Sequence, residues 1–328
     1  MQKSKGERSM VMQTEGIDRS KFATKSRMQQ FGQTVWRYRY MYLLVLPGVI
    51  YFVVFKGIPT LGLILAFQDY NPTLGFFNSE WVGLKHFQDL FASSEFYIML
   101  RNTMIINILA LVFFFPLPIV LAIMLNEVRN EVFKRVNQTI VYLPHFLSWV
   151  VIVSLTFILL SVDVGVINKV IRELGFEHYS FLNDSNLYWG ILTLQTIWKD
   201  VGWGTILFLA AIAGVNPEKY EAAVIDGANR LQQIWHVTLP AIRPTIVILL
   251  ILQLGKIADV NLEQVILMYK PLVRDVAEVF DTYVYYHGIM RGQHSLGVAV
   301  GFFKGLVGLV LIMGANYVVK RMGDEGIY

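Results

Sequence analysis

Six long apolar runs, separated by polar connections, organise the chain. They cover residues 41–67, 102–125, 139–162, 187–215, 245–268 and 296–319. Each run reaches the roughly 20 residues that a helix needs to cross the hydrocarbon core of a bilayer. The first run is longer than that, so we expect it to tilt or kink. Prolines lie within the first two runs, and the fourth run has a polar centre. The pattern predicts an all-α membrane protein with about six transmembrane helices.

Composition agrees with that prediction and narrows the chemistry. Hydrophobic residues make up 55% of the chain and charged residues 16%, against about 25% charged in a typical soluble domain. Cysteine is absent, which excludes disulfides and thiol chemistry. The histidines are scattered, with only His287 and His294 near each other, and no G-x-S-x-G nucleophile motif occurs. We therefore expect no metal site, no catalytic residue and no enzymatic activity.

The basic residues predict the topology. Residues 1–40 hold nine of the 28 Lys and Arg, against three acids. A nucleic-acid arm would also be basic, but a tail before an apolar run is far more often a cytoplasmic flank. A signal peptide fits poorly because both the basic segment and the apolar run are too long. Together with the second-to-third and fourth-to-fifth connections and the C-terminus, this tail holds 17 of the 28, which predicts that both termini are cytoplasmic.

This topology divides the chain into three parts. We expect a basic cytoplasmic tail at 1–40, a transmembrane domain at 41–320 and a cytoplasmic C-terminal tail at 321–328, in a bacterial cytoplasmic membrane. Residues 22–42 and 81–91 have helical apolar spacing among polar residues. We interpret them as interfacial helices, one on the inner face and one on the outer face, that anchor the protein to the membrane.

The connection at 216–244 is too long for a tight turn and contains its own helical pattern. Asn216 is a good N-cap, and Pro217 is tolerated at the first helical position because its missing N–H is not needed there. Gly227 should break this helix, a second one should resume at Leu231, and Pro240 should end it. The connection therefore predicts a helix–turn–helix that lies across the cytoplasmic face.

This connection also resembles a known signature. Glu221-Ala222-Ala223, three residues, Gly227, nine residues, Val237, one residue and Leu239-Pro240 resemble the "EAA" signature of ABC importer permeases, E-A-A-x3-G-x9-I-x-L-P. Only Val237 departs from it. Tyr220 and Asp226-Gly227-Ala228 resemble the carbohydrate-uptake branch. The resemblance extends over most of residues 40–328 through weaker matches. Those of the third-span region of sugar permeases are Arg135, Leu143-Pro144, Gly165 and Ile167-Asn168. Residues 280–285 and 302–304 resemble the LplB-like subfamily.

The resemblance implies a mechanical rather than a chemical role. In this family the first helix of the connection seats in a cleft of a cytoplasmic ATPase. Ala222 and Ala223 would allow close approach, Glu221 and Asp226 would offer charge, Gly227 would allow the turn, and Leu239-Pro240 would complete the motif. No G-x-x-x-x-G-K-[ST] phosphate loop occurs in the sequence. We expect no cofactor on this chain and ATP with Mg on separate ATPase subunits.

The resemblance also implies the assembly. We expect a second homologous permease, two cytoplasmic ABC ATPase subunits, an extracytoplasmic solute-binding protein and an oligosaccharide substrate, with no nucleic acid. Another small polar nutrient is an alternative cargo, since the signature reports only on the ATPase contact. An ion-coupled secondary transporter would usually have more spans and internal repeats, and a scaffold would leave the polar centres of the spans without a purpose.

Polar residues within the fourth and fifth apolar runs are candidates for the substrate pathway, because intramembrane polar groups are costly unless they pair or line a cavity. They are Gln195, Trp198, Lys199, Asp200, Trp203, Gln253, Lys256 and Asp259. Helical spacing places Gln195, Lys199 and Trp203 on one face, whereas Lys256 and Asp259 are close enough to pair with each other. Lys199 or Lys256 would suit an acidic sugar, but Lys199 and Asp200 could equally be satisfied between helices.

Overall fold

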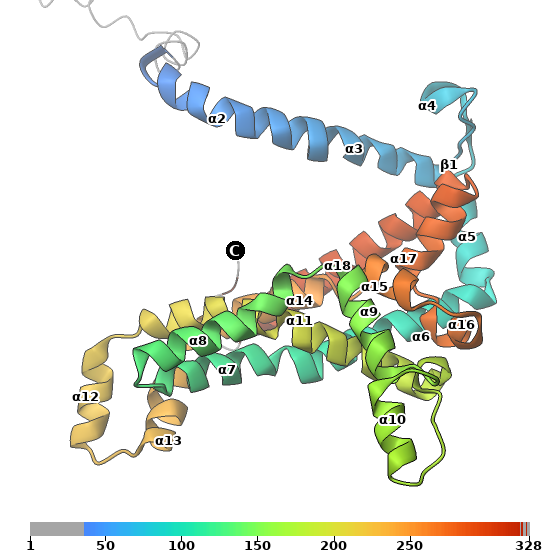
Figure 1. The fold of residues 1–328 in the computed structure, drawn as a ribbon. Helices are drawn as coiled ribbons and strands as arrows, with labels where there is room; N and C mark the ends of the chain where they lie inside the picture. The colour runs from blue at the N-terminus through green and yellow to red at the C-terminus, as the bar shows by residue number, and fades with distance from the viewer. Residues whose placement is uncertain (1–35, 322, 324–325, 327–328) are drawn as a thin grey trace, which may run out of the picture. The chain divides into compact units, whose positions relative to one another are not determined.

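Long helices follow the apolar runs in the computed structural model, which describes residues 36–321, 323 and 326 (Figure 1). The chain forms two units, Met1–Leu61 and Gly62–Tyr328. The described part of the first contains α2 (Arg39–Phe52), a π-helix η2 (Val53–Gly57) and α3 (Ile58–Thr60). Its apolar side chains are largely exposed, as lipid-facing residues would be.

The second unit contains the remaining elements in this order: η3 (Leu61–Phe67), β1 (Gln68–Asp69), α4 (Gly75–Asn78), β2 (Glu80–Trp81), α5 (Lys85–Ala92), α6 (Ser94–Leu109), η4 (Ala110–Phe114), α7 (Pro116–Glu127), α8 (Glu131–Tyr142), η5 (Leu143–Phe146), α9 (Trp149–Leu160), α10 (Val166–Glu173), η6 (Phe181–Asn183), α11 (Ser185–Ala213), α12 (Pro217–Ile225), α13 (Arg230–Gln233), η7 (Ile234–Thr238), α14 (Leu239–Gly255), α15 (Leu262–Met268), η8 (Pro271–Val273), α16 (Arg274–Ala277), α17 (Phe280–Tyr283), η9 (Val284–Met290) and α18 (His294–Arg321). The two short strands pair antiparallel, with Gln68 opposite Trp81.

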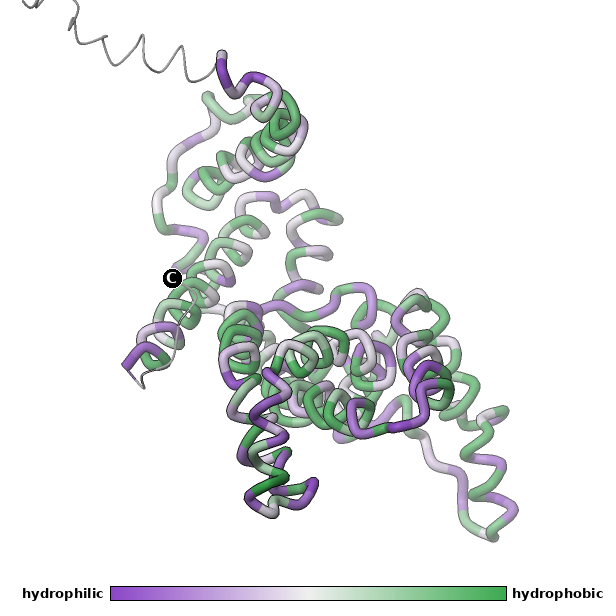
Figure 2. The backbone as a smooth tube through the Cα atoms, turned by 90° about the vertical axis from the view of Figure 1, so that its left-hand side faces the viewer, coloured by the Kyte–Doolittle hydropathy of each residue, from purple (hydrophilic) through white to green (hydrophobic). Residues whose placement is uncertain are grey.

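The all-α membrane fold is confirmed. Within the described residues, five helices are long and apolar enough to cross a membrane: Arg39–Phe67, Ser94–Glu127, Ser185–Ala213, Arg230–Gly255 and His294–Arg321. A sixth candidate is the pair Glu131–Phe146 and Trp149–Leu160, which is bent by 101°. Hydropathy along the backbone shows apolar helices joined by hydrophilic connections (Figure 2). The third span predicted at 139–162 corresponds to this pair, and the apolar run did not indicate the bend.

Proline does not end the spans, because a wider turn precedes it. Three π-turns, η2, η4 and η7, each lie two residues before a proline: Pro59, Pro116 and Pro240. Proline lacks an N–H and its ring clashes with the carbonyl four residues back; widening the preceding turn relieves that clash. The predicted helix end at Pro240 is consequently wrong, since the helix Arg230–Gly255 continues through it.

Lys199 holds the bend of the third span. Its Nζ donates to the carbonyls of His145 (2.7 Å) and Leu147 (2.5 Å), which lie where η5 gives way to α9. The His145 Nδ1 lies 2.8 Å from the Asp200 carboxylate, within hydrogen-bond distance. Trp203 stacks on the His145 ring, with the two ring centres 4.4 Å apart. In lipid, carbonyls freed by a break need another donor, and the fourth span supplies one.

The fifth span ends at Gly255 rather than near 268. An irregular segment follows before α15, and the expected pairing of Lys256 with Asp259 is wrong. Asp259 instead pairs with Lys304 of α18 at 2.9 Å, and Lys304 also reaches Asp281 at 2.6 Å. A single lysine thus ties the irregular segment and α17 to the last span.

The two predicted interfacial helices fare differently. Within 81–91 the helix begins only at Lys85, Trp81 lies in β2, and Phe87 and Leu90 are buried within the second unit. Most of 22–42 lies outside the described residues; from Arg39 onward it is the start of the first span. The membrane depth of both stretches stays a prediction.

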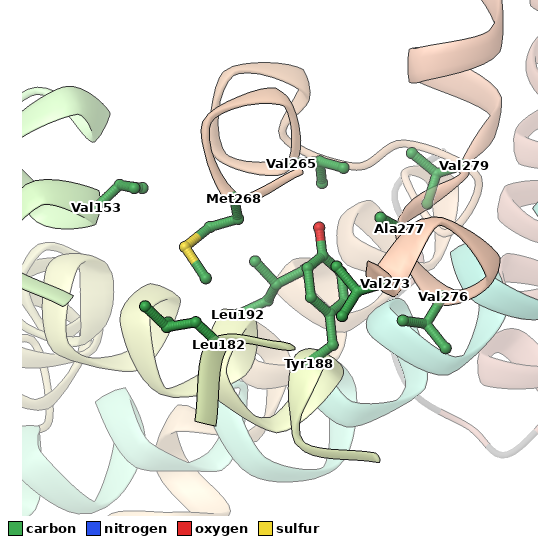
Figure 3. Packing of buried hydrophobic residues seen from close by; sticks show 10 residues of the cluster. All are labelled: Val153, Leu182, Tyr188, Leu192, Val265, Met268, Val273, Val276, Ala277 and Val279. Atoms are coloured by element: carbon green, nitrogen blue, oxygen red, sulfur yellow. The ribbon is translucent and has the colours of Figure 1, made fainter. Parts of the chain in front are cut away.

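The fourth span, α11, is the centre of the second unit. It packs against α6, α7, α8 and α14, and its first turns contribute Tyr188 and Leu192 to the main buried cluster (Figure 3). The Tyr188 hydroxyl is buried there with no hydrogen-bond partner, among valine and alanine side chains such as Val273 and Ala277. Where α11 crosses α8, Gly202 lies directly against the Val141 backbone.

Gly202→Ala should lower the stability of the protein. A Cβ at position 202 would lie 2.2 Å from the Val141 carbonyl oxygen, so the two helices must separate, at a cost of about 1–3 kcal/mol. Gly190→Ala on the same helix is the control, since nothing lies within 4 Å of a Cβ there. Thermal unfolding of the purified chain measures both; equal melting temperatures would contradict a tight crossing.

Lys199→Met should also destabilise the protein, by about 1.5–3 kcal/mol, because two carbonyls at the bend lose a charged donor. Lys256→Met removes the same charge from an exposed site with no side-chain partner among the described contacts, so its melting temperature should stay close to wild type. A Lys199→Met variant as stable as Lys256→Met would show that Lys199 does not hold the bend.

Candidate functional site

The connection 216–244 forms an arm of two helices, α12 and α13, at one end of α11 and α14 (Figure 1). The predicted start of the arm is confirmed. The Asn216 side chain accepts a hydrogen bond from the Glu218 N–H at 3.0 Å, and Pro217 is the first helical residue. The cap satisfies one of the N–H groups that every helix start leaves without a partner.

The turn between α12 and α13 is fully hydrogen-bonded. Gly227 has a φ of +80°, a conformation that glycine adopts with little strain. The Ala228 N–H bonds the Ala223 carbonyl at 2.8 Å and the Gly227 N–H bonds the Val224 carbonyl at 3.0 Å, a Schellman motif. The next helix starts with a reciprocal capping box between Asn229 and Gln232. The break predicted at Gly227 is confirmed, and hydrogen bonds on both sides of it define the conformation of the turn.

Two contacts join the arm to the spans. The Tyr220 hydroxyl lies 3.0 Å from the Thr238 Oγ1, which connects α12 to the π-turn before α14. The Arg230 guanidinium lies 3.6 Å from the Glu127 carboxylate at the end of α7. These contacts connect the arm to two spans, one that ends with α7 and one that contains α14, so a displacement of the arm would act on both.

The outer surface of α12 is exposed. None of its residues is buried, and two apolar side chains at its end, Val224 and Ile225, are 59% and 85% exposed. An apolar pair in this position, on an arm of this rigidity, suits a protein partner. Sequence reasoning selected the small and charged residues of the motif and missed these two, which occupy variable positions within it.

Hollows flank α12 on two sides. One, of about 700 Å³, is lined by Ala222, Ala223, Asp226, Gly227 and Pro240 among others. The other, of about 560 Å³, is lined by Glu221, Tyr220, Val224, Ile225 and residues at the end of α7. The structure thus brings six of the seven predicted coupling residues to the surface of the arm. Leu239 is half-buried and packs toward the span core instead.

The eight candidate pathway residues do not line one cavity. Gln195 is buried and bonds Thr156 (2.7 Å) and Gln264 (2.9 Å). Lys199, Asp200 and Trp203 surround the bend of the third span, as described above. Of the set, Gln195 and Trp198 line a shared hollow of about 370 Å³, which is otherwise almost wholly apolar.

The remaining three residues lie in or after α14. Gln253 is half-buried, and Lys256 is exposed just beyond the end of the helix. Asp259 belongs to the ion-pair cluster with Lys304 and Asp281. Sequence reasoning missed that cluster, although an isolated lysine within an apolar run was its signal. Within the described part of the chain, no three His, Cys, Asp or Glu residues come together as a metal site would require.

Comparison with known proteins gives concordant matches. The family model of the binding-protein-dependent transport system inner membrane component matches residues 114–324. The chain is 51% identical to Protein LplB of Bacillus subtilis (strain 168) over 292 residues, 89% of this chain and 92% of that protein. It is 52% identical over 290 residues to the polygalacturonan/rhamnogalacturonan transport system permease protein YteP of the same organism, covering 88% and 90%.

A solved structure agrees in fold and sequence. One chain of a bacterial alginate ABC transporter, crystallised with an alginate pentasaccharide-bound periplasmic protein, superposes with a TM-score of 0.82 at 37% identity, covering 90% of this chain and 99% of that one. The match includes the arm and the spans on both sides of it. The chain therefore belongs to the family of binding-protein-dependent transport system inner membrane components, as an ABC transporter permease and not an enzyme.

Proposed function

We propose that this permease imports oligosaccharide or polysaccharide fragments, including acidic ones. Two separate cytoplasmic ATPase subunits drive the import by binding the arm at α12. The observation that carries this proposal is the arm itself: a capped helix with no buried residue, exposed Val224 and Ile225, and a rigid glycine turn. A structure of this kind serves a partner, because its apolar end has no cover within the described chain.

The arm converts a movement of the ATPases into a movement of the spans. Glu221, Ala222, Ala223, Asp226 and Gly227 meet the partner in this proposal. ATP-driven closure then displaces α12, and the Tyr220–Thr238 and Arg230–Glu127 contacts pass the displacement to α14 and α7. A permease whose two states are biased by nucleotide at one end and by substrate at the other is an allosteric coupling in the ordinary sense. ATP and Mg remain on the partner subunits.

The remaining assembly rests on the charge pattern and on the relatives. The basic connections support a topology with the arm and both termini in the cytoplasm. In that topology the segments around α4, α10 and α15 to α17 face outward. There an extracytoplasmic solute-binding protein delivers substrate, and a second homologous permease completes the pore. The acidic cargo is supported by YteP, named for polygalacturonan and rhamnogalacturonan, and by the alginate transporter.

Gly227→Val should uncouple the transporter. A β-branched residue at a φ of +80° is strained by about 1–3 kcal/mol, so the turn that orients α12 relaxes while the spans stay intact. We expect the complex, with both permeases, ATPases and binding protein, to assemble but to lose substrate-stimulated ATP hydrolysis. Gly214→Ala, with a φ of −82° and only ordinary contacts for its Cβ, is the control. Stimulation equal to wild type in Gly227→Val would make the arm a mere connector.

Comparing the uptake of neutral and acidic sugars tests whether an intramembrane lysine contacts the substrate. Lys199 is engaged at the bend, which leaves Lys256 as the exposed cation of the proposed pathway. Lys256→Gln should reduce uptake of trigalacturonate into proteoliposomes several-fold and leave galactotriose unchanged, because only the uronate loses an ionic partner. Equal losses for both sugars would remove Lys256 from substrate recognition, and absence of any sugar uptake by wild type would contradict the proposed cargo.

A further inference from the structure

One π-helix in the described chain has no proline to explain it. The π-turns η2, η4 and η7 each precede a proline, but η9 (Val284–Met290) is seven residues long and is followed by Arg291, Gly292 and Gln293. Its widened backbone packs closely on α18, since Gly288 and Gly297 approach so nearly that a Cβ on either would lie about 3 Å from the other. π-helical turns without a local cause occur frequently at functional sites.

This π-helix forms one wall of a polar cavity of about 340 Å³. The lining residues that carry the argument are Tyr269, Arg274, Glu278, Tyr286, His287 and Arg291. The volume suits a sugar residue rather than a whole oligosaccharide. Unlike the almost wholly apolar hollow beside Gln195 and Trp198, this cavity combines aromatic faces with charged groups.

The walls of the cavity are held in place by contacts within the chain. Arg274 pairs with Glu278 at 3.2 Å, and the His287 ring stacks on Tyr283 at 4.2 Å, nearly parallel. The rings of Tyr269 and Tyr286 lie 6.3 Å apart. These contacts form without a ligand, so the arrangement of the walls is preformed. Sugars bind such sites through the aromatic faces and through planar hydrogen-bonding side chains.

Arg291 contributes a positive charge to the cavity. Its guanidinium donates to the His287 Nδ1 at 3.4 Å, and within the described residues no carboxylate forms an ion pair with it. Two arginines thus face one lining acid, Glu278. A second acid, Glu95, lies outside the lining but influences the same region. Burial raises the pKa of the Tyr283 hydroxyl, and the charges of Glu95 and Glu278 raise it further, whereas the charge of Arg291 lowers it.

We propose that this cavity is a subsite for a uronate residue of the incoming oligosaccharide, with the Arg291 guanidinium binding the sugar carboxylate and Tyr269 or Tyr286 contacting the ring. The inference rests on the proposed function and its topology, which put η9 on the outer side. There the cavity receives sugar from the binding protein before the sugar enters the spans. A guanidinium holds a carboxylate through two parallel hydrogen bonds, which a neutral sugar cannot form.

Direct binding to the full chain in phosphatidylcholine nanodiscs tests the subsite without any ATPase. Trigalacturonate and galactotriose are titrated by calorimetry onto wild type, Arg291→Gln and Arg291→Lys. We expect Arg291→Gln to weaken trigalacturonate binding about tenfold, the size of a lost charge-assisted contact, and Arg291→Lys to recover part of it. Galactotriose binding should change less than twofold. Because Arg291 is exposed and makes one weak contact, the variants should fold as wild type does.

Arg172→Gln is the matched control, because Arg172 is an exposed arginine of α10 that bonds only backbone carbonyls nearby. It removes the same charge and should leave both titrations unchanged. The subsite is overturned if wild type does not bind trigalacturonate, if Arg291→Gln binds it as wild type does, or if Arg172→Gln or galactotriose shows the same loss. Loss of coupling in Gly227→Val has no bearing on these titrations, so the two proposals fail separately.

Discussion

A backbone group in lipid must find its hydrogen bond within the protein, and the architecture of this permease depends on that constraint. Where the chain runs straight, the helix provides the bond itself. Where it breaks, another span must provide it, as Lys199 does for the carbonyls of His145 and Leu147. The irregular end of the fifth span is held differently, through side-chain ion pairs of Lys304 with Asp259 and Asp281. Charged residues in these spans are therefore part of the fold before they are part of any pathway.

The fold class and the arm were predictable because their causes are local. Apolar length defines a span, and Asn216, Pro217 and Gly227 define the arm through caps and a positive φ that neighbouring residues determine. The bend of the third span was not predictable in the same way, because its donor is 54 residues away from His145. The predicted stop at Pro240 failed for a different reason: a π-turn absorbs the proline, and propensity rules do not include such turns.

The candidate site divides along the same line. The coupling residues lie together because one short segment carries them, and their family resemblance is confirmed. Helical spacing predicted that Gln195, Lys199 and Trp203 share one face. The structure instead distributes the pathway residues among several places, including a bend, an apolar hollow and an ion-pair cluster. Spacing along one helix shows which side chains are neighbours. It does not show which other helix lies opposite, and that decides whether a polar group is a structural bond or a binding group.

The π-turn between α13 and α14 also sets a rotational phase. One extra residue in a helix turns everything beyond it by about 100° around the axis. The π-turn therefore determines how the face of α13 that carries Arg230 is oriented relative to the face of α14 that packs in the membrane. Adding or removing one residue in this turn would therefore rotate the arm about the axis of the span while leaving both helices intact.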